Sequence, residues 1–182
     1  KSLFPTGAHT ELREQKSRSR RVSLVQGNLT GNERAESCGI SARVYRNGVY
    51  GFSSMAECSG GAAETVLRAA AENALFMDRH VGRGKGPLPV IPCGDVPAGR
   101  AIQDTDQKQY LEFAKALDAY IAGKYKNLSS RSVMVSEDSM EKIVCTSAGY
   151  DGHICAPRSY VYISLGAEST AGRPRERFHP AG

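Results

Sequence analysis

The sequence predicts an α+β fold, in which one antiparallel sheet of about six strands carries two helices packed on one face. Three observations support this class: a strand–turn–strand pattern over residues 36–54, two stretches with helical spacing of apolar residues, and a second block of alternating residues after 132. The predicted order is βββ-α-linker-α-βββ. Neither half looks able to bury its apolar face alone, so we expect the 182 residues to form one domain or a two-lobed one.

The segment 36–54 is predicted to be a β-hairpin. Ile40, Ala42 and Val44 alternate with polar side chains, which places the apolar set on one face of a sheet. Asn47-Gly48 then favours a two-residue type I′ turn, because both central positions of that turn need a positive φ. Gly51 in the returning strand indicates a bulge or a close neighbouring backbone. Upstream, residues 20–29 are predicted to be a strand and Thr30–Glu36 a polar connection.

The first helix is predicted to follow Ser59, whose hydroxyl suits an N-cap. It is expected to fade between Arg79 and Gly82. The residues at helical spacing have small side chains, so this helix should approach a sheet closely; they are Ala62, Ala63, Val66, Leu67, Ala70, Ala74 and Leu75.

Residues 81–103 are predicted to be a Pro/Gly linker, because four prolines between 81 and 100 exclude a continuous helix. The second helix should begin at Asp104 as N-cap, with Gln107 three residues later as in a capping box. It should end near Gly123 and Lys124. Its wide apolar face is expected to be core, formed by Tyr110, Leu111, Phe113, Ala114, Leu117, Tyr120 and Ile121.

The last third is predicted to return to strands, followed by a mobile basic tail over residues 171–182. The expected elements are strand Ser132–Glu137, turn Asp138-Ser139, strand Met140–Thr146, loop 147–152 and strand Ser159–Ala167.

Composition indicates a globular protein with no membrane-spanning segment. Hydrophobic residues make up 40% of the chain, and no apolar run approaches the roughly 20 residues that cross a bilayer. The net charge of +5 permits attraction to nucleic acid or to an acidic protein. Solvated basic surfaces are the favoured interpretation, since no aromatic residues interleave with the basic clusters Lys16–Arg21, Arg83–Lys85 and Arg173–Arg177.

The five cysteines are odd in number, widely spaced and without a Cys-x-x-Cys motif: Cys38, Cys58, Cys93, Cys145 and Cys155. This pattern favours free thiols in a reducing cytoplasm over a zinc ribbon or a redox pair. A pairing of Cys145 with Cys155 across neighbouring strands remains open.

Several segments, in order, resemble the opening of the TldD/PmbA family, also called the modulator-of-DNA-gyrase family. They are Glu11–Arg13, Val22–Leu29, Gly39–Val44 and Gly48–Ser54, and the similarity runs on through the alanine-rich helix and more loosely to Ser169. The resemblance implies a metallopeptidase lineage whose zinc motif, His-Glu-x-x-x-His, lies in a later catalytic domain. It therefore implies that residues 1–182 are an N-terminal domain without the catalytic one.

The residues themselves offer no candidate active site. The four histidines, His9, His80, His153 and His179, form no His-Glu-x-x-His or His-x-His motif. His153 and Cys155 are two apart and should share a face, but two ligands are too few for a zinc site. Asp78 and His80 could orient each other at the end of the first helix. We predict no catalytic, metal-binding or cofactor-binding residue in this chain.

Two functions follow as hypotheses. The first is a non-catalytic N-terminal domain of a TldD/PmbA-like metallopeptidase, involved in proteolysis of unfolded or modified peptides. In that role it would cover the catalytic cleft and aid assembly with a homo- or heterodimer partner of the same family in the cytoplasm, and zinc would belong to the catalytic domain only. The alternative is a stand-alone basic module that binds nucleic acid or an acidic protein.

Overall fold

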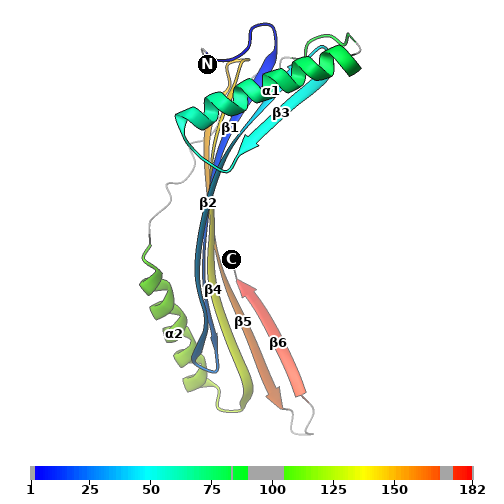
Figure 1. Cartoon of the computed structure of the whole chain (residues 1–182). Coiled ribbons are helices and arrows are strands. Elements are labelled where there is room, and N and C mark those ends of the chain that lie inside the picture. Colours follow the sequence, from blue (N-terminus) through cyan, green and yellow to red (C-terminus); the bar gives the residue numbers. More distant parts are fainter. Residues whose placement is uncertain (1–2, 83, 90–104, 169–173, 182) are drawn as a thin grey trace. The chain divides into compact units, whose positions relative to one another are not determined.

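A six-stranded open sheet with two helices forms the fold. The computed structural model describes residues 3–82, 84–89, 105–168 and 174–181. The strand order across the sheet is β3-β2-β1-β4-β5-β6 (Figure 1). The elements are β1 His9–Val25, β2 Asn28–Arg46, β3 Val49–Met55, α1 Gly60–Val81, α2 Gln107–Lys124, β4 Leu128–Thr146, β5 Asp151–Glu168 and β6 Pro174–Ala181. This confirms the predicted α+β class and the predicted order of elements.

The chain divides into two compact units. Unit 1 comprises Lys1–Ser17, Ser37–Arg100 and Met140–Cys155, and unit 2 comprises Arg18–Glu36, Ala101–Ser139 and Ala156–Gly182. The strands β1, β2, β4 and β5 each contribute residues to both units, whereas α1 and β3 belong to unit 1 and α2 and β6 to unit 2.

Neighbouring strands run antiparallel. The β2–β3 pairing extends from Ile40↔Met55 to Arg46↔Val49, and the turn between them has φ values of 49° at Asn47 and 92° at Gly48. The positive φ at both positions confirms the predicted I′ turn. At the two ends of the β1–β4 pair, the Ser147 N–H donates to the Thr10 carbonyl at 2.9 Å and the Gln26 N–H donates to the Arg131 carbonyl at 2.8 Å.

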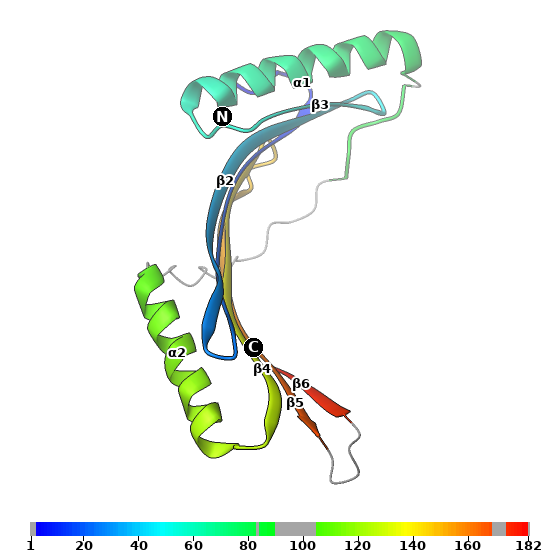
Figure 2. The ribbon, with the colours of Figure 1, turned by 60° about the horizontal axis from the view of Figure 1, so that its bottom comes forward.

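The core of unit 1 is apolar and rich in alanine. Ala70 and Ala74 of α1 are fully buried against β2 residues that include Val44, and α1 lies along β3 in Figures 1 and 2. A Cβ atom added at Gly51 would overlap the Ala70 carbonyl oxygen and the Ala74 nitrogen. The close backbone approach predicted at Gly51 is therefore confirmed. Ser59 caps α1 as predicted, accepting a hydrogen bond from the Ala62 N–H at 3.1 Å.

Unit 2 has a core of larger side chains. Val22 and Leu24 of β1 and Val133 and Val135 of β4 are buried against α2, together with Ile121. The apolar face of α2 is narrower than the sequence predicts, since Phe113 and Tyr120 are exposed. The helix cap is Asp106, which accepts from the Lys108 N–H at 3.3 Å; Asp104, the predicted cap, lies outside the described residues.

Several strands extend through segments that the sequence assigns to turns or loops. Thr30–Glu36, predicted to be a polar connection, belongs to β2, and the predicted turn at Asp138-Ser139 lies inside β4. β5 begins at Asp151 rather than at Ser159. Polar segments give no apolar alternation to detect, but their backbones still pair with neighbouring strands.

The C-terminal end also departs from the prediction of a mobile tail. Pro174–Ala181 forms β6 and pairs with β5 from Val161↔Ala181 to Glu168↔Pro174. Prolines favour a loop interpretation, but a terminal strand tolerates them because one of its edges has no partner to receive hydrogen bonds. Of the predicted linker 81–103, residues 84–89 form neither helix nor strand, and residues 90–103 lie outside the described part.

Candidate functional site

Unit 1 contains a groove where four segments meet at one end of its strands. The groove has a volume of about 640 Å³. It is lined by the N-terminal segment before β1, the β2–β3 turn, the segment Lys85–Leu88 and the β4–β5 turn. Its walls mix apolar groups, such as Phe4 and Leu88, with polar ones, such as His9 and Asn47.

Short contacts hold the walls of the groove in place. The Tyr45 hydroxyl donates to the Gly86 carbonyl at 2.9 Å, which fixes the Lys85–Leu88 segment against β2. A Cβ atom at Gly48 would lie 2.8 Å from Cβ of Lys85, so glycine is required there both for this approach and for the turn. Asp78 lies near the C-terminal end of α1. Its Oδ2 atom accepts hydrogen bonds from Arg46 Nε at 3.2 Å and from Asn47 Nδ2 at 3.0 Å.

The groove also presents a serine hydroxyl that is engaged by the backbone. Its Ser147 hydroxyl accepts from the Thr10 N–H at 2.9 Å and donates to the Ala8 carbonyl at 3.4 Å. Among the described lining residues, that hydroxyl is therefore occupied by backbone groups and is not paired with a base such as His9.

A second feature of unit 1 is a cluster of three different metal-ligand types on β4 and β5. Glu141, His153 and Cys155 present a carboxylate oxygen, a ring nitrogen and a sulfur that all lie within 4.8 Å of one another. His153 Nε2 is 2.7 Å from Glu141 Oε1 and 3.5 Å from Cys155 Sγ. Within the residues that the structure describes, this is the group best suited to hold a metal ion.

Two further thiols face each other near the start of α1. Burial and a hydrogen bond with Cys38 raise the pKa of the Cys58 thiol to about 11. Cys58 is therefore protonated at neutral pH and is a weak nucleophile. Nearby, the Lys16 ammonium is 3.1 Å from Glu14, and this hydrogen-bonded partner raises the pKa of Lys16.

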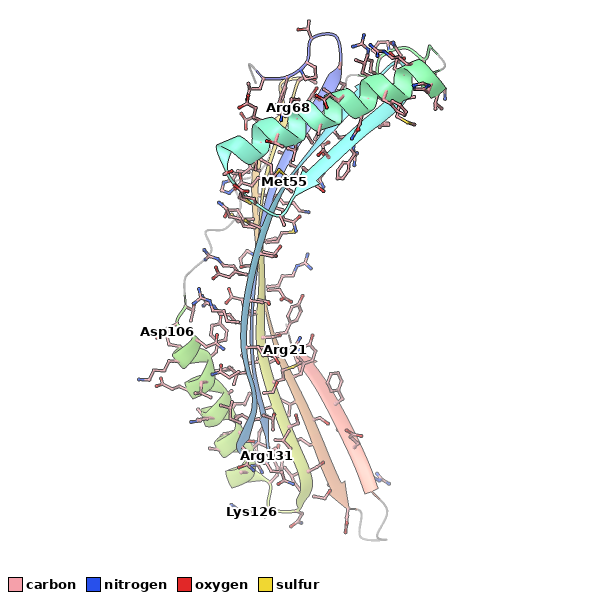
Figure 3. All side chains as sticks on the ribbon, viewed as in Figure 1. Arg21, Met55, Arg68, Asp106, Lys126 and Arg131 are labelled. Carbon is pink, nitrogen blue, oxygen red and sulfur yellow. The ribbon has the colours of Figure 1, made fainter. Side chains whose placement is uncertain are left out.

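The charged groups of unit 2 hold its helix to its sheet. Arg131 of β4, labelled in Figure 3, donates through Nε and Nη2 to the buried Asp118 of α2 at 2.6 and 3.0 Å. The Tyr110 hydroxyl of α2 donates to Glu137 of β4, and Arg20 lies 3.9 Å from the same carboxylate. Burial and then the Glu137 carboxylate raise the pKa of Tyr110.

The structure separates the histidines that the sequence singles out. His9 lines the groove, His80 packs its ring on Phe76 with centroids 4.4 Å apart, and His153 joins the cluster. Asp78 pairs with Arg46 and Asn47 rather than orienting His80. The side chain of His179 lies outside the described residues.

Sequence reasoning missed Glu141 and the groove. Glu141 is twelve residues from His153 along the chain, so ligand spacing does not reveal it. The short loop after Thr146 is the feature of the sequence that could have revealed Glu141. If the strands on either side of that loop are paired outward from it, residue 141 lies beside residue 155. The groove has no comparable signal, since its four segments are distant in the sequence.

Exposed aromatic side chains mark the sheet face of unit 1 that is turned away from α1. Tyr50 and Phe52 of β3 are exposed, and the Arg43 guanidinium lies 5.8 Å from the centroid of the Tyr50 ring. Arg43 and Phe52 are direct partners in the β2–β3 register. We call Arg43, Tyr50 and Phe52 the aromatic face.

None of the described helices is long and apolar enough to cross a membrane.

Comparison with protein-family models finds a match in the first half of the chain. Residues 10–77 match the family model of PmbA/TldA metallopeptidase domain 1. Among curated proteins, no sequence matches the chain significantly. The match includes β1, β2, β3 and most of α1, the segments that carry the ordered motifs of the sequence.

Solved structures share the fold over nearly the whole chain. A candidate modulator of a DNA gyrase from Thermotoga maritima matches with a TM-score of 0.71 at 17% identity, covering 96% of this chain and 40% of that one. A second candidate modulator, from Bacteroides thetaiotaomicron, gives 0.70 at 14% identity, with 94% and 40% covered. TldE from Thermococcus kodakarensis gives 0.65 at 13% identity, with 98% and 40% covered.

The present chain thus spans about 40% of the length of each of these solved relatives. The family-model match and the shared fold agree with the resemblance in the sequence. Residues 10–77 of the chain are similar to the first domain of the PmbA/TldA metallopeptidases.

Proposed function

We propose that this chain is the non-catalytic first domain of a TldD/PmbA-like metallopeptidase that acts on unfolded or modified peptides. Its role is to cover the cleft of a separate catalytic domain, to shape peptide access and to aid assembly. The observation that carries the proposal is the match of residues 10–77 to the first domain of a metallopeptidase family.

The residues of this chain do not fit the catalytic zinc that the family implies. None of the four histidines is followed by glutamate, so the His-Glu-x-x-x-His motif is missing from the 182 residues. That helical motif supplies two ligands and a general base together. We therefore assign no step of peptide hydrolysis to the side chains of this chain.

The exposed edge of β3 suits the handling of an extended peptide. β3 is the terminal strand of the sheet on its side, and terminal strands accept an added strand through main-chain hydrogen bonds. The aromatic face lies beside that edge and offers Tyr50 and Phe52 as apolar contacts. Unfolded peptides expose apolar side chains, which such a surface binds.

Assembly and compartment follow from the same proposal. The partners are the catalytic domain and a homo- or heterodimer partner of the same family, in the cytoplasm. The four described cysteines are free thiols, which is typical of proteins in a reducing compartment.

Peptide binding is the first test. A fluorescently labelled unfolded peptide is titrated with the chain and followed by anisotropy. Phe52→Ser should weaken binding several-fold. Phe113→Ser is the matched control, because Phe113 in unit 2 is 53% exposed and Phe52 is 55% exposed. Equal affinity of the peptide for the unsubstituted chain, Phe52→Ser and Phe113→Ser would contradict peptide binding at the aromatic face.

Peptide hydrolysis is the second test. The purified chain, incubated with Zn²⁺ and an unfolded protein substrate, should release no peptides above the rate of a buffer blank. A known zinc peptidase in the same assay shows that the substrate is cleavable. Zinc-dependent hydrolysis by these 182 residues would overturn the non-catalytic assignment.

Within the described residues, the structure offers no specific observation in favour of nucleic-acid binding. In the described part of unit 2, Arg18 and Arg34 form ion pairs with Glu36, and Arg20 is buried against Glu137. Arg18 and Arg20 belong to the first basic cluster, Lys16–Arg21, and their pairing within the protein leaves that cluster weaker than its sequence indicates. Binding to DNA that falls steeply with added salt would revive the alternative.

A further inference from the structure

We propose that Glu141, His153 and Cys155 form a binding site for a borderline-soft divalent metal ion, Zn²⁺ foremost, on the β4–β5 ribbon of unit 1. The site is separate from the catalytic zinc of the family, and it departs from our expectation of a chain without metal ligands. The proposal does not depend on the proposed function, because it rests only on three side chains and the strands that carry them.

The strand register places the three ligands on one face. The Thr146 N–H donates to the Tyr150 carbonyl at 2.9 Å, and Cys145 Sγ contacts Asp151 Oδ1 at 3.4 Å across the two strands. Counting outward from these pairs sets Glu141 opposite Cys155, with His153 two residues along β5. Side chains at alternate positions point to the same side of a sheet, so two paired strands present all three ligands together.

The distances are close to those around a tetrahedral ion. Zinc lies about 2.0–2.1 Å from nitrogen and about 2.3 Å from sulfur, so neighbouring ligands of one ion are roughly 3.3–3.6 Å apart. The separation of 3.5 Å between His153 Nε2 and Cys155 Sγ already fits. The 2.7 Å contact between His153 and Glu141 must widen by about half an ångström. These side chains are 56% and 31% exposed, so they are free to make that adjustment.

The ligand types select the ion. A thiolate and an imidazole favour Zn²⁺, Co²⁺ and similar ions over Mg²⁺ and Ca²⁺, which prefer oxygen ligands. Three protein ligands leave a fourth position for water, and the exposure of His153 opens the site to solvent. The Lys16 ammonium interacts electrostatically with Glu141 and would repel a bound cation, and its own ion pair with Glu14 offsets part of that repulsion.

Co²⁺ is the probe for the test, because its thiolate complexes absorb visibly. The full 182-residue chain, with its thiols reduced, is titrated with Co²⁺. We expect a thiolate-to-cobalt charge-transfer band and tetrahedral d–d bands that saturate at one equivalent and disappear on addition of Zn²⁺. Cys155→Ser should abolish the charge-transfer band. His153→Gln and Glu141→Gln should retain it with at least tenfold weaker binding.

Matched controls separate this site from the other thiols. Cys145→Ser removes a thiol on the same ribbon that contacts Asp151 and lies outside the cluster, and it should leave the spectrum unchanged. Cys38→Ser and Cys93→Ser should also leave it unchanged. Far-UV circular dichroism confirms that each variant is folded.

Three results would overturn the proposal. The first is the absence of a charge-transfer band in the unsubstituted chain. The second is a band that persists in folded Cys155→Ser. The third is the loss of the band in Cys38→Ser or Cys93→Ser, which would show that Co²⁺ binds at a different cysteine. The hydrolysis assay is not affected by any of these results, so failure of this site and failure of the proposed function are distinguishable.

Discussion

Units 1 and 2 combine the same ingredients, one helix on antiparallel strands, but they fill the space between helix and sheet in different ways. Unit 1 uses alanines and the bare backbone at Gly51, and the buried residues of α1 are all apolar. Unit 2 buries the charged Asp118 among apolar residues and satisfies it with Arg131. A second polar link in unit 2 joins Tyr110 of α2 to Glu137 of β4.

The difference shows that two kinds of packing set the position of a helix on a sheet. In unit 1 the α1 backbone approaches β3 so closely at Gly51 that a side chain there would overlap Ala70 and Ala74, and this close packing acts together with the Asp78 contacts to Arg46 and Asn47 to set the position of the helix. In unit 2 larger side chains leave room for polar groups, and hydrogen bonds between defined partners determine it. The two units should therefore be sensitive to different substitutions.

Enlarging Gly51 should have the largest effect. The Gly51→Val substitution places carbon atoms in the space that the Ala70 and Ala74 backbone occupies. The new Cβ atom would lie only 2.8 Å from the Cα atom of Ala74. We expect a loss of more than about 3 kcal/mol in the free energy of unfolding. Hydrogen exchange followed by mass spectrometry should show α1 losing protection while α2 keeps it.

Gly123→Ala is the control for this substitution. Nothing lies within 4 Å of the Cβ position at Gly123, and alanine is the better helix former by roughly 1 kcal/mol. The variant should be as stable as the parent or more stable. Normal protection of α1 in Gly51→Val would contradict the close packing described for unit 1.

Breaking the Asp118–Arg131 pair should have the next largest effect, confined to unit 2. Asp118→Ala leaves the Arg131 guanidinium largely buried without its acceptor, because their side chains are only 7% and 14% exposed. We expect a loss of about 3 kcal/mol, measured by urea unfolding. Replacing both residues by apolar ones of similar volume should recover much of that loss.

An exposed ion pair on the same helix is the comparison. Lys108 and Glu112 are 3.7 Å apart and well exposed, so Glu112→Ala should cost less than about 0.5 kcal/mol. A loss in Asp118→Ala no greater than in Glu112→Ala would show that the buried pair does not hold α2.

These contrasts also show what the sequence could predict. The Asn47-Gly48 turn, the Ser59 cap and the close approach at Gly51 were predictable, because each is a local situation that few residue types satisfy. The Asp118–Arg131 pair was not, since an aspartate on a helix and an arginine on a strand are ordinary surface residues until tertiary structure joins them.

The candidate site was less predictable than the fold. His153 and Cys155 were recognised as sharing a face, but Glu141 joins them only through the β4–β5 register. The sequence placed a turn at Asp138-Ser139, inside what is one long strand. It also predicted a loop over residues 147–152 and began the next strand only at Ser159, so the register that brings the ligands together was hidden.

High pH should produce the smallest effect and should act on unit 1 first. The pKa of Cys58 is raised from 9.0 to about 11 by burial and by Cys38. Below pH 9 the thiol is protonated in both states, so its effect on stability is constant. Between pH 9 and pH 11 the unfolded chain releases the proton more readily, and stability should fall by on the order of 1 kcal/mol.

Urea unfolding across that pH range measures the effect. Cys58→Ala should flatten the slope, whereas Cys145→Ala should keep it. Tyr110, whose pKa is also raised, gives unit 2 a dependence of the same sign at higher pH. An unchanged slope in Cys58→Ala would assign the whole effect to other groups.

The strands shared by both units have a consequence for how this protein can be divided. Each unit is assembled from three separate stretches of chain, so no single cut in the backbone releases either one whole. The Thr10–Ser147 contact joins residues 137 positions apart, and such distant pairings form slowly. We expect versions shortened from either end to be degraded rather than to fold as half-proteins.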